Sequence, residues 1–93
     1  MKIRIEKSIQ RDLKKIADPL VNAQVESVYL AVKAAVSPKD IPELRKLQGS
    51  KKGIHYRIRV GDYRIGVTIE GDLVTFVRCK LRKNAYKKTA KGV

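Results

Sequence analysis

The sequence is poor in the residues that build disulfide-linked or metal-held folds. It has one cysteine, one histidine and no tryptophan among 93 residues. The lone Cys79 cannot form an internal disulfide, and one histidine does not complete a zinc-ligand set. Because Cys79 lies among apolar and basic residues, we expect it to be a small buried hydrophobic side chain. We therefore expect a fold that needs no metal and no cofactor.

Long apolar runs are also missing. No run approaches the ~18 residues that cross a bilayer. The opening stretch, MKIRIEKSIQRDLKK, has no uninterrupted apolar segment of the kind that signal peptides contain. We expect a cytoplasmic protein with no membrane partner.

Acidic residues are scarce. The chain has 9 Asp and Glu against 22 Lys and Arg, which gives a formal net charge of +13. Such a balance favours polyanionic partners such as nucleic acid or acidic protein segments. The hydrophobic fraction of 43% is ordinary for a globular chain. The length suits one domain over 1–93, in which about 83–93 is expected to form a basic, partly flexible C-terminal tail.

Apolar spacing in the first third of the chain predicts one strand and two helices. Residues 2–6 alternate basic and apolar side chains, which indicates a short strand with both isoleucines facing inward. Ser8 stands where a helix N-cap belongs, and apolar residues then recur at helical spacing until Pro19. A second helix is expected over about 20–36. Its buried side would carry a stripe of valines, Val21, Val25, Val28, Val32 and Val36.

After a long connection over 37–53 the apolar spacing changes to period two. Three strands are expected, over 54–60, 63–69 and 73–81, joined by short turns that contain glycine and aspartate. Such turns force neighbouring strands to be antiparallel. The resulting order, β-α-α-β-β-β, predicts an α+β fold in which a two-helix hairpin packs on one face of an antiparallel sheet.

The face of that sheet turned away from the helices is strongly basic. Its expected outward residues are His55, Arg57, Arg59 and Arg64 in the first hairpin and Arg78, Lys80 and Arg82 in the last strand. Solvation explains part of this, because an exposed face must be polar and cations at sheet edges discourage aggregation. However, only Asp62 and Glu70 supply clear negative charge there, and both lie at turns. Uncompensated cations on adjacent strands oppose folding, so we interpret the face as an anion-binding surface.

Arginine dominates the centre of this face, and its planar guanidinium matches the oxygens of a phosphate group. Tyr86 follows Arg82 by four residues in the basic tail. An aromatic ring beside several arginines suits stacking on an unpaired base of single-stranded RNA. The alternative is that Tyr86 folds back onto the core. Together, the arginines and the tyrosine favour RNA as the anionic partner.

The stretch YRIRVGDYRIGVTIEGDLVTFVRCKLRKNAYKK, residues 56–88, resembles the RelE branch of the RelE/ParE superfamily of toxin–antitoxin toxins. KSIQRDLKKI, residues 7–16, is similar to the first helix of that family, and LRKLQG, residues 44–49, to its Leu-x-x-Leu-x-Gly lead into the hairpin. The resemblance implies a ribosome-dependent endoribonuclease that cuts mRNA in the decoding site and inhibits translation. A ribose 2′-OH would attack the adjacent phosphate while basic residues stabilise the developing charge.

Carried over by position, the resemblance implies site residues on the hairpin, the last strand and the tail. The implied catalytic residues are Arg57, Arg59, Arg64, Lys80, Arg82 and Tyr86, and RNA contacts are expected from His55, Arg78 and Lys83. Where many relatives have histidine before the last arginine, this chain has Leu81, which cannot transfer a proton. Arginine is no substitute because it stays charged. Lys80, Tyr86 and His55 are therefore the candidates for proton transfer.

The resemblance also implies partners and leaves alternatives open. A cognate acidic antitoxin would cover the basic face, and the substrate would be mRNA held on the ribosome, with contacts to ribosomal RNA. The first alternative is a ParE-type inhibitor of DNA gyrase, which acts by binding. The second is a catalytically inactive relative that binds RNA or ribosomes and leaves the message intact.

Overall fold

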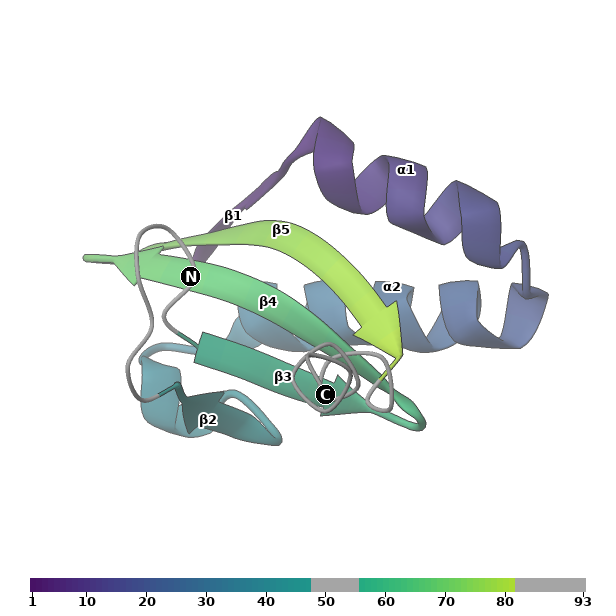
Figure 1. Cartoon of the computed structure of the whole chain (residues 1–93). Coiled ribbons are helices and arrows are strands. Elements are labelled where there is room, and N and C mark those ends of the chain that lie inside the picture. The colour runs from purple at the N-terminus through teal and green to yellow at the C-terminus, as the bar shows by residue number, and fades with distance from the viewer. Residues whose placement is uncertain (48–55, 82–93) are drawn as a thin grey trace, which may run out of the picture.

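A five-stranded mixed sheet with the strand order β1-β5-β4-β3-β2 organises the chain (Figure 1). The computed structural model describes residues 1–47 and 56–81. The elements are β1 (Lys2–Ile5), α1 (Lys7–Ile16), α2 (Pro19–Ala34), the 3-10 turn η1 (Pro38–Asp40), β2 (Leu44–Lys46), β3 (Tyr56–Val60), β4 (Tyr63–Glu70) and β5 (Leu73–Leu81). The predicted α+β class, with two helices against a sheet, is confirmed. Neither helix of this described part is long and apolar enough to cross a membrane.

The sheet differs from the expected one in two details. Residues 44–46, expected to lie in a loop, form strand β2 and pair antiparallel with β3. Strand β1 pairs parallel with β5, so the sheet is mixed and not wholly antiparallel. Short turns fix the direction only within the β3-β4-β5 meander. Strands β1 and β5 come from opposite ends of the chain, and no turn constrains how they pair.

Two tight turns produce the antiparallel meander. Gly61 between β3 and β4 has φ 58°, and Gly71 between β4 and β5 has φ 62°. Glycine adopts a positive φ without a steric penalty, and a positive φ at the first turn position matches the right-handed twist of the two strands. The glycine–aspartate turns expected from the sequence are therefore present.

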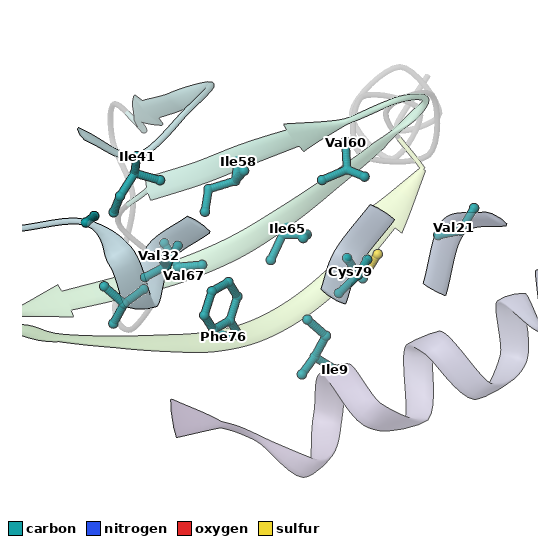
Figure 2. Packing of buried hydrophobic residues seen from close by; sticks show 13 residues of the cluster. Ile9, Val21, Val32, Ile41, Ile58, Val60, Ile65, Val67, Phe76 and Cys79 are labelled. Carbon is teal, nitrogen blue, oxygen red and sulfur yellow. The ribbon is translucent and has the colours of Figure 1, made fainter. Parts of the chain in front are cut away.

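The core lies between the inner face of the sheet and the two helices (Figure 2). Its fully buried large residues are Phe76, Ile9, Ile58, Ile65, Val25, Val32, Val67 and Val74. The ring of Tyr29 meets Phe76 edge-on, with ring centroids 4.8 Å apart and planes at 71°. The expected valine stripe of α2 holds as far as Val32. The helix ends at Ala34, so Val36 is 87% exposed instead of buried.

Helix α1 packs along β5, and α2 contacts β1 and β3 (Figure 1). The N-cap of α1 is Glu6 and not Ser8, and Glu6 makes no side-chain capping bond. The Ser8 hydroxyl instead donates to the carbonyl of Val77 on β5, which ties the first turn of the helix to the sheet. Asp18 caps α2 by accepting from the Leu20 amide at 2.9 Å, and Pro19 occupies the first helical position.

Candidate functional site

A row of cationic residues crosses the outer face of the sheet. In the strand register, Arg59 on β3 pairs with Arg64 on β4, and Arg64 pairs with Lys80 on β5. Directly opposed residues share one face, and their Cβ atoms lie ~4.5–5.5 Å apart. The inner faces of these strands carry Ile58, Ile65 and Cys79, which are buried. The three cations therefore form one row on the side away from α2, and we call it the cationic row.

A second row lies beside the first, two residues along each strand. It runs from Arg45 on β2 through Arg57 on β3 and Gly66 on β4 to Arg78 on β5. Gly66 has no side chain, so the row is interrupted in the middle of the sheet. Neither row contains an acidic residue. The two rows together form a basic platform that favours binding of a polyanion.

A β-bulge separates the two ends of β5. The register passes from Val67–Phe76 to Gly66–Arg78, which leaves Val77 as the inserted residue. Val77 lies two residues before Cys79 and would share its face in a regular strand, but it lies outside the core cluster because the bulge follows the buried Phe76. The bulge places Arg78 and Lys80 at the edge of the platform, where α1 approaches the strand.

Asp12 on α1 is the one buried charged residue of the described part of the chain. Its Oδ2 lies 2.9 Å from Arg78 Nε and also accepts from the Cys79 amide at 2.9 Å, and its Oδ1 lies 3.2 Å from Arg78 Nη2. Burial raises the pKa of Asp12, but the bonds from Arg78 and Cys79 and the charge of Lys80 outweigh it, so the pKa lies below its ordinary value. Asp12 was not among the site residues predicted from the sequence. The feature that could have indicated it is that Asp12 is the single acidic residue of a helix whose other charged residues are basic.

A hollow of about 400 Å³ opens between α1 and the end of β5. It is lined by Asp12, Lys15, Ile16, Tyr63, Cys79, Lys80 and Leu81. Burial raises the pKa of the Cys79 thiol to about 11, and the charge of Asp12 adds to that shift. Cys79 is 2% exposed, which confirms it as a buried hydrophobic side chain and not a nucleophile. Lys80 joins this hollow to the cationic row.

The structure brings part of the predicted site together. Arg57, Arg59, Arg64 and Lys80 share the platform, with Arg59 and Lys80 exposed and the other two half-buried. Arg78 lies in the second row but is bound to Asp12. The remaining predicted residues lie outside the described residues: His55, Arg82, Lys83 and Tyr86.

Comparison with known proteins assigns the chain to a family. The family described as ParE toxin of type II toxin-antitoxin system, parDE, matches residues 3–86. The chain belongs to this family of toxins. It is 31% identical over 87 residues to Toxin RelE3 of Methanocaldococcus jannaschii. The alignment covers 92% of this chain and 96% of the relative. The chain is thus a RelE-type toxin of the RelE/ParE superfamily.

Solved structures of RelE-type toxins share the fold. A RelB-RelE antitoxin-toxin complex from Methanococcus jannaschii aligns with TM-score 0.73 at 27% identity, covering 91% of this chain and 96% of that one. An archaeal RelE-RelB complex from Pyrococcus horikoshii aligns with TM-score 0.68 at 19% identity, covering 87% and 93%. The second likeness concerns the fold alone.

Proposed function

We propose that this RelE-type toxin is a ribosome-dependent endoribonuclease that cleaves mRNA in the decoding site and so inhibits translation. The observation that carries the proposal is the cationic row, Arg59, Arg64 and Lys80, on three adjacent strands. A rigid row of cations on a sheet suits a phosphate that gains negative charge during a reaction, because fixed charges need no reorganisation. The ribosome lies in the cytoplasm, which is where the toxin would act.

The proposed reaction begins with attack of a ribose 2′-OH on its own 3′ phosphate. The bond from phosphorus to the 5′-oxygen of the next nucleotide breaks, and a 2′,3′-cyclic phosphate and a 5′-hydroxyl remain. A base takes the proton from the 2′-OH, and an acid gives one to the leaving oxygen. Arg57, Arg59 and Arg64 remain charged throughout and stabilise the phosphorane.

Proton transfer falls to groups other than arginine. Lys80, at one end of the cationic row, is the candidate within the described residues. Tyr86 and His55 are the other two candidates, and Arg82 is proposed as a further phosphate contact. Arg78 and Lys83 are proposed to bind RNA away from the scissile phosphate. For Arg78 this role adds to its bond with Asp12, since its side chain is 41% exposed.

The proposed protein partner is a cognate acidic antitoxin. Two relatives of the same fold are described in complexes with the antitoxin RelB. The net charge of +13 here favours fast, salt-sensitive association with an acidic chain. Such a chain would shield the basic platform and compete with RNA for it.

The test is cleavage of a defined message by the purified protein, with and without ribosomes, followed by mapping of the new 5′ ends. We expect cuts only when ribosomes carry the message. The Arg64→Ala/Tyr86→Phe double variant should lose them, and Lys39→Ala, which removes one exposed cation from η1, should keep them. Full activity of the double variant would contradict the site assignment.

Two other outcomes would replace the proposal. An intact message together with inhibited supercoiling by purified gyrase would favour the ParE-type function, to which the name of the matching family gives support. Salt-sensitive binding to ribosomes with neither effect would indicate an inactive relative.

A further inference from the structure

Helix α2 carries an apolar face that nothing in the described chain covers. The residues Leu20, Ala23, Ser27, Leu30 and Ala34 are all exposed. Their spacing alternates three and four residues, which is the a/d pattern of a helix that packs against another helix. We call this set the α2 stripe. The opposite side of α2 packs against the core through Val21, Val25 and Val32.

The exposed large hydrophobic residues of the described part of the chain gather at this helix. Leu20 is 66% exposed, Leu30 is 65% exposed, and Val36, just beyond the helix end, is 87% exposed. Exposed apolar side chains scattered singly need no explanation, but a contiguous set marks an interaction surface. The α2 stripe and Val36 therefore need a partner.

The charges on α2 indicate what that partner is. The helix carries only Glu26 and Lys33 in a chain where 33% of residues are charged. These two have opposite sign and lie seven residues apart, each directly before a stripe residue, Ser27 and Ala34. They occupy equivalent flanking positions one heptad apart.

An antiparallel copy of the same helix satisfies this pattern. When Ser27 of one copy lies opposite Leu30 of the second, Ala23 lies opposite Ala34, and Leu20 comes beside Val36. In the same register Glu26 of each copy lies beside Lys33 of the other, so the ion pair forms twice. A two-fold axis produces every contact in duplicate, as an isologous interface requires.

A groove beside the stripe fits this packing. It has a volume of about 230 Å³, opens next to Ser27 and Ala31, and has Val28, Pro42 and Ile58 among its walls. Leu30 of the second copy, opposite Ser27, lies at its mouth. The interface would thus combine a projecting leucine with an apolar recess, the knob and hole of helix packing.

We propose that the protein forms a weak two-fold dimer through the α2 stripe. The stripe lies on the helix side of the sheet, so dimerisation leaves Arg64 and Lys80 of the cationic row open, whereas Arg59 also lines the groove. Two copies of net charge +13 repel each other at long range, and α2, with one charge of each sign, is where they can approach. Higher ionic strength should therefore tighten the dimer, whereas it weakens binding of RNA.

The test is sedimentation equilibrium of the full chain over roughly 10 µM to 1 mM, the range expected for a small interface. Leu30→Glu should be monomeric where the parent is dimeric. Asn22→Glu is the matched control, since it adds the same charge to an exposed position of α2 outside the stripe, and it should dimerise like the parent. A parent chain that is monomeric throughout, at low and at high salt, overturns the proposal.

A charge exchange tests the register. Glu26→Lys alone should weaken the dimer about tenfold, because two attractive pairs become two repulsive ones. The Glu26→Lys/Lys33→Glu double variant should restore it, and failure of this rescue refutes the antiparallel arrangement. If the chain alone is monomeric and Leu30→Glu instead abolishes binding of an acidic antitoxin, the stripe belongs to another protein and the second copy is wrong. Message cleavage is measured separately, so failure of either proposal leaves the other intact.

Discussion

Asp12 and Arg78 join α1 to β5 through a two-pronged ion pair, with Oδ2–Nε at 2.9 Å and Oδ1–Nη2 at 3.2 Å. The same carboxylate accepts from the Cys79 amide, which belongs to the part of β5 beyond its pairing with β1. Asp12 thus supplies the acceptor that a neighbouring strand would otherwise provide. A buried carboxylate with this many donors is favourable only while all of them are present.

We expect Asp12→Ala to lower the free energy of unfolding by about 2–4 kcal/mol. The substitution leaves the Cys79 amide without its acceptor and Arg78 without its partner. Asp12→Asn should cost less, since its amide oxygen still accepts one hydrogen bond. Urea denaturation followed by circular dichroism gives both values. In a double-mutant cycle with Arg78→Met, the combined loss should be smaller than the sum of the single losses.

Acid should weaken the fold through the same carboxylate. The pKa of Asp12 is below its ordinary value in the folded state, so its stabilisation is complete above the unfolded pKa of about 4. It is lost as the pH falls through the lowered folded pKa. The free energy of unfolding should therefore drop below about pH 4, and Asp12→Asn should flatten this part of the curve. An unchanged slope in the variant would assign the acid sensitivity to other carboxylates.

The thiol of Cys79 should be unreactive until the protein unfolds. Its pKa is raised to about 11 by burial, and the side chain is 2% exposed, so little thiolate forms at neutral pH and reagents cannot reach it. Ellman's reagent should react slowly in native buffer and completely in urea. The native rate should follow the fraction unfolded as urea is added. Fast modification without urea would show that the edge of β5 opens locally.

The sequence predicted the elements whose spacing is local. Period-two alternation and the two glycine turns were enough to predict the β3-β4-β5 meander and the direction of its strands. The parallel pairing of β1 with β5 could not be predicted, because it joins residues about 70 positions apart with no turn between them. The three-residue strand β2 is too short for alternation to be recognised.

Residues of the site could be predicted wherever side chains alternate regularly between the two faces of a strand. The cationic row follows from the alternation of β3 and β4, since Arg59 and Arg64 flank a tight turn. The bulge at Val77 interrupts the alternation of inward and outward side chains in β5. The residue types around Val77 do not predict this bulge. The bond from Asp12 to Arg78 depends on where α1 meets the sheet, which is a tertiary contact invisible to periodicity. The same reason hides the α2 stripe, whose exposure depends on the packed fold.

Ala17, at the C-terminal end of α1, has a strained backbone conformation that a substitution can relieve. Ala17 has φ 47°, a left-handed conformation that favours glycine, while its amide donates to the Leu13 carbonyl at 3.0 Å. Ala17→Gly should raise the free energy of unfolding by about 0.5–1 kcal/mol. As the matched control, Lys14→Gly in the regular last turn should lower it by roughly the same amount. Thermal unfolding of the two variants and of the parent measures these opposite changes in stability.

Finally, the cationic row should determine how RNA binding depends on salt. Each cation that contacts a phosphate of single-stranded RNA contributes about 0.7 to the slope of log K against log salt. Arg59→Ala and Lys80→Ala should each reduce that slope by about this amount. Lys39→Ala removes the same charge from η1, away from the row, and should leave the slope unchanged. Fluorescence anisotropy with a short unstructured RNA measures all three. Equal reductions in the three variants would show that net charge attracts RNA without a defined contact, and would separate the row from the site proposed for it.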